Sequence, residues 1–200
     1  PLPEKWHGLQ DAEERFRKRY LDALMSLEVR DRFITRSKII TQLRKIFDED
    51  GYLEVETPAL QPLYGGASAE PFVTEHNALG MRMYLRISDE LYLKRMLVAG
   101  FPKIYEIARD FRNEGIDMTH NPEFTMVEFY ESFSDADKQM VFVEKIFKTL
   151  VKEIKGDSFV VYDGQNIDFS KKFAVFSYFE LWKEYAGIDA ESISKKELKT

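Results

Sequence analysis

Two alternating runs separated by a polar loop constrain the fold of this chain most strongly. The first run covers residues 104–111 and the second covers residues 124–130. Successive side chains of a strand point to opposite faces, so the two runs predict a pair of strands. The loop between them, residues 113–123, is too long for a tight turn, and such a polar loop in a compact domain is typically functional or mobile. We therefore expect a hairpin that ends in a functional or mobile loop.

The alternation divides this hairpin into two faces. Phe124, Glu128 and Tyr130 share one face, and we expect Arg112 to converge with them in a cleft while the other face packs on a core. An arginine can bind a phosphate or carboxylate through two parallel hydrogen bonds, and a phenylalanine offers a flat surface for a purine ring. A glutamate among aromatic residues is costly unless it is paired. From the residues alone, a solvated hairpin with ordinary surface charges is an equally good interpretation.

Composition narrows the class of protein. The 200 residues are 44% hydrophobic and 14% aromatic, which is enough for one large or two small folded domains and argues against disorder. The net charge is −6 with both signs interspersed, so we expect no duplex nucleic acid to be held by this chain alone. The chain has no cysteine, three scattered histidines and no apolar run of membrane-spanning length. These features predict a soluble, cytoplasmic protein without disulfides, a zinc site or a membrane partner.

Hydrophobic periodicity and capping residues predict the remaining elements. We expect helices over residues 11–27, 32–50, 88–99, 135–155 and 177–185, a further helix opening at the capping box of Ser194 and Glu197, strands over residues 52–55 and 84–87, and a small hairpin over residues 159–169. Residues 60–79 read as a loop. The expected buried stripes are Phe16, Tyr20, Leu21 and Leu24 in the first helix, Ile39, Ile40, Leu43, Ile46 and Phe47 in the second, Leu91, Leu93, Met96 and Leu97 in the third, and Val141, Ile146, Phe147, Leu150 and Ile154 in the fourth.

Three weaker signals each have a functional and a plain interpretation. The glycine-rich residues 65–69 suggest a backbone that approaches something closely, but a flexible loop is the better reading of those residues alone. Glu90, near the start of a helix, could hold a substrate ammonium, or it could simply gain about 0.3–1 kcal/mol from the helix dipole. His120 could contact a phosphate, although the sequence alone favours an ordinary loop histidine.

Three segments together resemble the class II aminoacyl-tRNA synthetases, and within them the bacterial-type lysyl-tRNA synthetases. Residues 36–58, with Gly-Tyr-Leu-Glu-Val-Glu-Thr-Pro at 51–58, resemble motif 1 of the class. Phe-Arg-Asn-Glu at 111–114, His-Asn-Pro-Glu-Phe-Thr at 120–125 and Glu128 resemble motif 2. Between the two motifs, residues 65–72, 76–79, 84–87 and 90–95 resemble the corresponding segments of the lysine-specific enzymes of this class. The resemblance extends to about Tyr130 and thins after Phe173.

The resemblance implies an α+β fold with an antiparallel sheet flanked by helices, and a homodimer formed through the motif 1 region. It implies a ligase that uses ATP and Mg²⁺ to activate L-lysine as lysyl-adenylate and then transfers the lysine to tRNA(Lys). Magnesium would bridge the phosphates of ATP, and we expect no metal ligand from this chain itself.

Residue by residue, the resemblance implies that Arg112 is catalytic and contacts both the α-phosphate and the lysine carboxylate. The ATP side would consist of Arg112 with Glu114, His120 and Phe124, the last stacking on adenine. The lysine side would consist of Arg112 with Gly66, Glu90, Glu128 and Tyr130. In that group Gly66 and Glu90 would hold the α-amino group, and Glu128 and Tyr130 would face the terminal amine.

The sequence departs from the family pattern in three ways: the anticodon-binding barrel and motif 3 are missing, and Ser88 and Asp89 precede the glutamate. Residues 5–11 and 19–22 resemble the join to the barrel, so we expect residues 1–27 to be a linker and helix that follow the missing domain. Residues 28–200 would be the N-terminal part of the catalytic domain, and motif 3 is missing. We therefore expect a fragment that is inactive alone. Ser88 and Asp89 stand where a proline commonly precedes the glutamate, and the extra acid could change the electrostatics of Glu90 or cap the helix.

Two other functions remain open from the sequence. One is a related lysine ligase that modifies a translation factor and has no anticodon-binding barrel, against which the join at residues 5–22 argues. The other is a non-catalytic dimerisation or regulatory module that keeps the fold, against which the intact Arg112, Glu114 and Phe124 argue.

Overall fold

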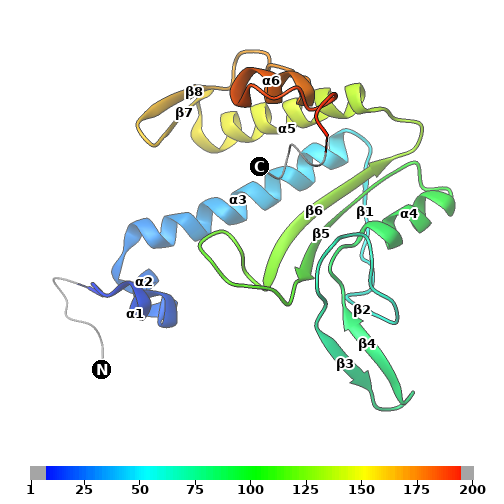
Figure 1. Ribbon diagram of the computed structural model, residues 1–200. Coiled ribbons are helices and arrows are strands. Elements are labelled where there is room, and N and C mark those ends of the chain that lie inside the picture. The colour runs from blue at the N-terminus through cyan, green and yellow to red at the C-terminus, as the bar shows by residue number, and fades with distance from the viewer. Residues whose placement is uncertain (1–7, 195–200) are drawn as a thin grey trace.

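A computed structural model describes residues 8–194 (Figure 1). The helices are α1 (Ala12–Arg17), α2 (Arg19–Met25), α3 (Leu27–Glu49), α4 (Glu90–Val98), α5 (Ala136–Lys155) and α6 (Tyr178–Ala186). The strands are β1 (Leu53–Glu54), β2 (Leu60–Gln61), β3 (Val73–His76), β4 (Met81–Leu85), β5 (Lys103–Phe111), β6 (Glu123–Glu131), β7 (Phe159–Tyr162) and β8 (Gln165–Asp168). The expected hairpin is β5 and β6, and its strands lie within about one residue of their predicted limits.

This hairpin belongs to a three-stranded sheet with the order β1-β5-β6, in which β5 is the central strand. Its strands pair antiparallel, with Ile107 opposite Val127 and Asp110 opposite Phe124. A hydrogen bond from Arg112 N to Pro122 O, 2.9 Å long, closes the hairpin just beyond the paired residues. β1 runs parallel to β5, so this sheet is mixed, while the other described strand pairs are antiparallel, which is compatible with the expected antiparallel sheet. The parallel pairing arises because the chain leaves α3, passes through β1 and returns to β5 only after a long excursion through α4.

One face of the hairpin packs on α3 and α5. Phe47 of α3 is fully buried, and its ring stacks on Tyr105 of β5 with centroids 4.4 Å apart. Phe142 of α5 stacks on Tyr52 at 5.1 Å, and Phe129 of β6 contacts both layers. Such aromatic pairs add to the free energy that comes from burying their surface. This cluster is the main hydrophobic core and holds the hairpin rigidly from behind.

Helix α5 begins and ends where its capping residues predict. The Asp135 side chain accepts a hydrogen bond from Lys138 N, and Gly156 ends the helix with a positive φ of 74°. The predicted apolar stripe is wrong by one residue at its start. Phe142 and Ile146 are buried, whereas Val141 is 70% exposed and Phe147 49% exposed. Phe142 takes the inward position because its ring fills the space between Tyr52 and Phe129.

The N-terminal helix differs from its prediction. It is broken at Lys18, whose φ of −116° and ψ of 48° are not helical, and a new helix begins at Arg19. Of the predicted stripe, Leu21 is buried but Phe16, Tyr20 and Leu24 are exposed. In the N-terminal part of α3 Val29 is buried, but Leu27, Phe33 and Ile34 are exposed. The other buried residues of α3 are Ile46 and Phe47, near its C-terminal end, and both belong to the core that packs on the sheet.

A second sheet, with the order β2-β4-β3, lies beside the first (Figure 1). The region predicted as loop contains β2 and β3, and β3 pairs antiparallel with β4 from Val73–Tyr84 to His76–Met81. The sequence does not predict β3, because all but one of its residues are exposed and they show no apolar alternation. The small hairpin β7-β8 turns at Asp163 and Gly164, both with positive φ, as that dipeptide predicts.

Helix α4 begins one residue later than expected, because Asp89 rather than Ser88 is its N-cap. Of its predicted stripe, Leu93 is buried and Leu91 is 41% exposed. Residues 5–7 of the predicted barrel join and Glu197 of the predicted second capping box lie outside the described residues. Among residues 8–194, no helix has the length and apolarity needed to span a membrane.

Candidate active site

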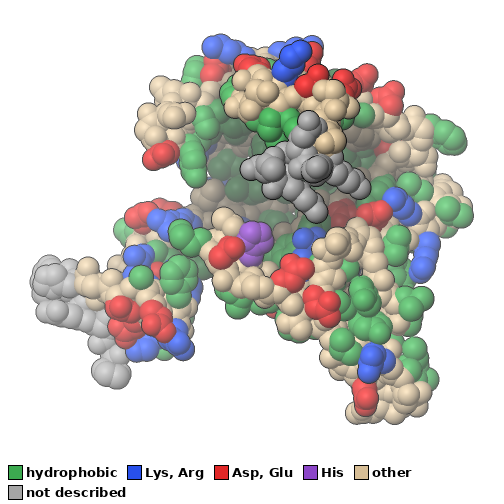
Figure 2. Space-filling model, in the orientation of Figure 1, with side chains coloured by type: hydrophobic (Ala, Val, Ile, Leu, Met, Phe, Trp, Pro, Cys, Tyr) green, Lys and Arg blue, Asp and Glu red, His purple; other side chains and the backbone are tan. Residues whose placement is uncertain are grey.

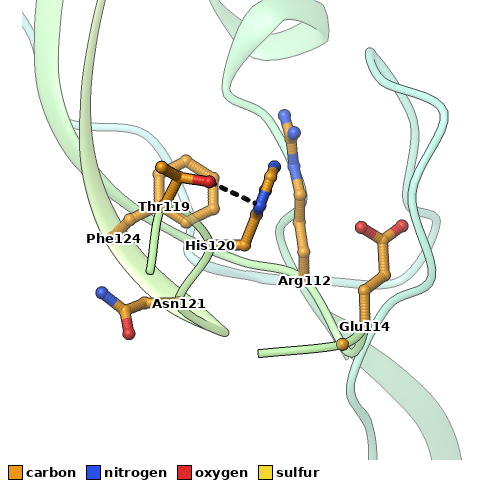
Figure 3. Close-up of a pocket in the computed structure, with 7 residues that line it drawn as sticks. Arg112, Glu114, Thr119, His120, Asn121 and Phe124 are labelled. Atoms are coloured by element: carbon orange, nitrogen blue, oxygen red, sulfur yellow. Dashed lines mark hydrogen bonds between the residues drawn. The ribbon is translucent and has the colours of Figure 1, made fainter. Parts of the chain in front are cut away.

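The loop end of the hairpin carries a pocket of about 220 Å³. The four residues assigned to the ATP side line it together with three loop residues: Arg112, Glu114, Gly115, Thr119, His120, Asn121 and Phe124. Figure 3 shows the side chains of Arg112, Glu114 and His120 extending to the same side of the backbone, with Phe124 behind them. The strand alternation explains this grouping, because Arg112 follows Asp110 on the face that Phe124 shares.

Arg112 brings a positive charge to this pocket. Its guanidinium carbon lies 5.1 Å from the centroid of the Phe124 ring, which is the geometry of a cation–π contact. Its Nε is buried and has no hydrogen-bond partner among the described residues. A buried donor without a partner is expensive, so a bound acceptor such as a phosphate or carboxylate oxygen would stabilise it.

The loop that carries His120 is organised by Asp117. This carboxylate accepts hydrogen bonds from Thr119 N at 2.7 Å and His120 N at 2.8 Å, and it lies 2.8 Å from His120 Nδ1. These contacts lower the pKa of Asp117 to about 2, the Thr119 amide having the largest effect. The side chain of His120 remains 71% exposed, so it is oriented but still accessible. Glu114 accepts a hydrogen bond from Glu70 N at 3.3 Å, which connects the loop to the second sheet.

The residues assigned to lysine meet at Ser88, which the sequence had suggested only as a helix cap. Its Oγ donates to Glu128 Oε1 at 3.0 Å and accepts from Glu90 N at 3.2 Å. Tyr130 donates to the other oxygen of Glu128 at 2.9 Å. Burial and the neighbouring carboxylate of Glu128 raise the pKa of Tyr130, so its hydroxyl stays protonated and keeps donating. Glu90 pairs with Lys94, whose Nζ is 2.6 Å from its carboxylate.

The glycines at 65 and 66 are required by close packing against α4. A methyl group on Gly66 would lie 2.9 Å from Ser88 Oγ and 3.0 Å from Glu90 Cβ, and its φ is +89°. A methyl group on Gly65 would lie 2.8 Å from Leu91 Cδ1. The backbone of the glycine-rich segment therefore lies close against the start of α4, which favours the close-approach interpretation over a flexible loop. Gly66 and Glu90 are neighbours, as their joint assignment requires.

A buried ion pair supports this side of the hairpin. Arg86 Nη1 lies 2.8 Å from Glu106 Oε1, and both side chains are less than a tenth exposed. Arg86 also donates to the backbone oxygens of Arg109 at 2.8 Å and Thr57 at 3.0 Å. Thr57 Oγ1 donates to Glu106 at 2.6 Å. A buried pair is stable only when its remaining hydrogen-bonding groups are satisfied, and these contacts supply most of what the pair needs.

Two further carboxyl groups, those of Asp89 and Asp110, gather with Glu128 next to Ser88. Asp89, Asp110 and Glu128 each place one oxygen within 4.8 Å of the other two, and both aspartates are 0% exposed. Burial, followed by the charge of Glu128, raises the pKa of Asp89 to about 8. Burial also raises the pKa of Asp110, to about 6, against the opposing charge of Arg86. The cluster can therefore bind a cation, or it must hold a proton.

Sequence reasoning predicted the side chains on both sides of the site but missed those that support them. Ser88, Asp89, Asp110, Arg86 and Glu106 were not assigned. A signal was present for two of them, because alternate residues back from Arg112 on β5 are Asp110, Ala108 and Glu106. Ser88 and Asp89 stood out only as a departure from the family pattern. Over the face shown in Figure 2, acidic and basic side chains are interspersed, as the composition suggests.

Comparison with known proteins gives one family. Residues 11–199 match the family model described as tRNA synthetases class II (D, K and N). A lysine–tRNA ligase of Roseiflexus sp. (strain RS-1) is 57% identical over 169 residues, which cover 84% of this chain and 35% of that protein. A lysine–tRNA ligase of Roseiflexus castenholzii is 51% identical over 98% of this chain and 40% of its own length. One of Methanoculleus marisnigri is 51% identical over 99% of this chain and 39% of its own length. The chain thus spans well under half the length of these relatives.

Proposed function

Because this chain belongs to the class II tRNA synthetases of the D, K and N group, we propose that the full-length protein containing it is a lysine–tRNA ligase. It would activate L-lysine with ATP and transfer the lysine to tRNA. The relatives that cover most of the chain at about half identity all carry that name, which supports this proposal over a ligase that modifies a translation factor. The intact pocket around Arg112 supports an enzyme over a non-catalytic module.

The single observation that carries the proposal is Arg112 in the pocket that Phe124, His120 and Glu114 line, with a buried Nε that has no hydrogen-bond partner among the described residues. This pocket is the first group of residues in the proposed site. The second group, around Glu128, lies four residues further along β6 from Phe124, or roughly 13 Å at the rise of a strand. A nucleotide bound in the first group and an amino acid bound in the second would both present an anionic group to the guanidinium.

The proposed chemistry needs little covalent help from the protein. A lysine carboxylate oxygen attacks the α-phosphorus of ATP, the bond from that phosphorus to the bridging oxygen breaks, and pyrophosphate leaves. Arg112 would reduce the repulsion between the two anions and hold them in line, which is how positioning and electrostatics accelerate phosphoryl chemistry. Phe124 would stack on the adenine, and His120 and Glu114 would line the phosphate side.

The described pocket fits a nucleoside triphosphate better than a metal site of its own. Among the described residues that line it, Glu114 is the one carboxylate, and it already accepts a hydrogen bond from Glu70 N. Mg²⁺ would therefore be held mainly by phosphate oxygens and water, with Glu114 nearest to it. When bound, it supplies positive charge to the phosphates.

On the lysine side, two carboxylates match the two ammonium groups of the substrate. Glu90 and the backbone at Gly66 would hold the α-amino group, since the two are in contact at the start of α4. Glu128, held by Ser88 and Tyr130, would bind the terminal ammonium. Lys94 would have to move away from Glu90 when the substrate binds, because its ammonium occupies the carboxylate that the α-amino group would contact.

Amino-acid-dependent ATP–pyrophosphate exchange on the full-length protein tests this function. We expect exchange with L-lysine and at least about a hundredfold less with L-aspartate or L-asparagine, because their short side chains leave Glu128 unpaired. Exchange that follows aspartate or asparagine instead of lysine would refute the lysine assignment while leaving the family intact.

We also propose that the protein dimerises through the region of α3 and β1, is cytoplasmic, and is divided near residues 27 and 28. The apolar residues that α3 leaves exposed, Leu27, Phe33 and Ile34, support a partner surface there. Sedimentation of the full-length protein would test the dimer, with Phe33→Glu as the disrupting variant and Phe176→Glu, at another exposed phenylalanine, as the control.

A further inference from the structure

Two buried carboxyl groups have no role in the proposed reaction. Asp89, at the start of α4, and Asp110, on β5, are both fully buried. None of their four side-chain oxygens accepts a hydrogen bond within the part of the chain that the structure describes. One oxygen of each lies within 4.8 Å of Glu128. Unpartnered buried carboxylates are among the most expensive groups a fold can contain, so their convergence on Glu128 requires an explanation.

The charged and titratable groups around Asp89, Asp110 and Glu128 come from several elements. Asp89 meets the charges of Glu128 on β6 and Asp110 on β5, and Asp110 in turn meets Arg86 just before α4, Glu106 on β5 and Arg112 just after β5. Tyr130 on β6 meets Glu90 on α4 as well as Glu128. Arg86 is engaged by Glu106 and two backbone oxygens, and its Nε lies 3.3 Å from Asp110. Arg112 lies over Phe124. Asp110 therefore has some compensation, whereas Asp89 and Glu128 share a region with excess negative charge.

A proton can relieve this excess when no substrate is bound. Burial and the nearby Glu128 raise the pKa of Asp89 to about 8, so at neutral pH the aspartate is largely protonated. Glu128 is the better site for the negative charge because it already accepts hydrogen bonds from Ser88 and Tyr130. The N-terminus of α4 favours an anion at Asp89, but it does not outweigh the burial.

This inference rests on the proposed function. We propose that Asp89 and Glu128 share one proton in the absence of amino acid, and that the terminal ammonium of lysine displaces that proton when it binds Glu128. The N–H groups of the ammonium then take the place of the O–H, and the proton leaves to water through the partly exposed Glu128. Asp89 is thus a positioning residue that couples lysine recognition to proton release, with Asp110 raising the negative charge behind it.

The coupling favours a ligand with a cationic tip. A neutral side chain of similar length would have to leave the proton in place and would gain nothing from the buried aspartates. An ammonium meets two carboxylates instead of one, and in a site of low dielectric the second charge strengthens the interaction. The departure from a proline at position 89 therefore adds charge to the lysine side instead of serving only as a helix cap, since Asp89 makes no capping hydrogen bond.

Calorimetry of lysine binding to the full-length protein tests the proposal. At pH 7, titrations in buffers of different ionisation enthalpy give the number of protons released. We expect close to one proton per lysine in the wild type, less than about 0.3 in Asp89→Asn, and the wild-type value in Asp163→Asn, an exposed turn position. Between pH 6.5 and 7.5 the wild-type Kd should fall up to about tenfold, whereas the Kd of Asp89→Asn should hardly change.

The outcomes separate the two proposals. Lysine binding whose heat does not depend on the buffer in the wild type would overturn proton displacement and leave the function intact. Proton release that survives in Asp89→Asn would also overturn it. If lysine fails to bind and another amino acid binds, the proposed function itself fails. Circular dichroism checks the fold of Asp89→Asn, and if that variant is unfolded, the wild-type proton count and its pH dependence decide the question alone.

Discussion

The two faces of the β5-β6 hairpin are made by the same two strands, yet they are stabilised in opposite ways. The face toward α3 and α5 is an aromatic core in which Phe47, Tyr105 and Phe142 exclude water. The face toward α4 buries Glu106, Asp110 and Arg86. The first face stabilises the sheet by burying apolar surface, while the second keeps charge in a place where charge is costly. The contrast shows that one face supports the fold and the other is organised to meet ligands.

The difference is a consequence of strand geometry. A period of two residues lets Tyr105 and Ile107 enter a core while Glu106 and Asp110, at the alternate positions of the same strand, face a site. The rigid core behind the hairpin then fixes the positions of the charged side chains in front of it. Substitutions on the two faces should accordingly damage different properties, stability on one face and ligand binding or its pH dependence on the other.

The largest effect on stability is expected from Phe47→Ala. The ring is fully buried between four aromatic neighbours, so its loss should reduce the free energy of unfolding by about 3–5 kcal/mol. Hydrogen exchange of the β5 amides in the full-length protein would measure this locally. The matched control is Phe133→Ala, at a fully exposed phenylalanine, which should change protection by less than about 0.5 kcal/mol. Equal losses in the two variants would contradict the aromatic core.

Arg86→Met should cost a similar amount on the other face but for a different reason. Removing the guanidinium leaves Glu106 and Asp110 buried without their cation, which typically costs about 3–5 kcal/mol. Unlike the Phe47 effect, this loss should shrink as the pH falls toward 5, because burial raises the pKa of Asp110 to about 6 and its protonation removes one uncompensated charge. The same exchange experiment at pH 5 and 8 checks it, with the exposed Arg82→Met as control. A deficit that does not depend on pH would mean that Arg86 acts by packing alone.

Asp89 should make stability depend on pH in a direction opposite to that of a salt-bridged acid. Its pKa is near 4 when unfolded and about 8 when folded, so the folded state binds more protons between these values and stability falls as the pH rises through 8. From pH 6 to 9 the wild type should lose on the order of 2 kcal/mol relative to Asp89→Asn, whose amide cannot ionise. Urea unfolding of both proteins across this range would check it. Parallel pH profiles would show that Asp89 is already ionised when folded.

The smallest effect is expected at Ser88, whose hydroxyl joins the carboxylate of Glu128 to the backbone of Glu90. Ser88→Ala removes one hydrogen bond to Glu128 and one from Glu90 N. A loss of about 1 kcal/mol corresponds to a roughly fivefold higher KM for lysine, with the KM for ATP unchanged. Steady-state exchange kinetics on the full-length protein measure both, and Ser170→Ala on the distant β8 side provides the control. An equal rise in both KM values would indicate general damage to the fold.

The sequence predicted what depends on neighbouring residues and missed what depends on distant ones. The limits of β5 and β6, the Asp135 and Gly156 caps of α5 and the Asp163-Gly164 turn are local, and they were correct within about a residue. The alternation and the family resemblance both grouped Arg112 with Phe124, and these two residues line one pocket, whereas Glu128 and Tyr130, expected in the same cleft, are not among the residues that line it. The burial of Asp89 and Asp110 was not predicted, since it depends on residues distant in the sequence: Asp89 precedes α4 but lies near Glu128 of β6, and Asp110 lies near Arg86. The break at Lys18 and the strand β3 carry no periodic signal at all.

The most direct test compares two arginines at the end of the hairpin. Arg112, just after β5, lies on the site side, and Arg109, on β5, lies on the opposite face and pairs with Glu123 on the surface. Lysine-dependent ATP–pyrophosphate exchange should fall by at least about a hundredfold in Arg112→Ala, roughly 3 kcal/mol, because a cation between two anions is removed. The same substitution at Arg109 should leave the rate within about threefold of wild type. Near-normal exchange in Arg112→Ala, or equal losses in both variants, would contradict the assignment of the site to that face.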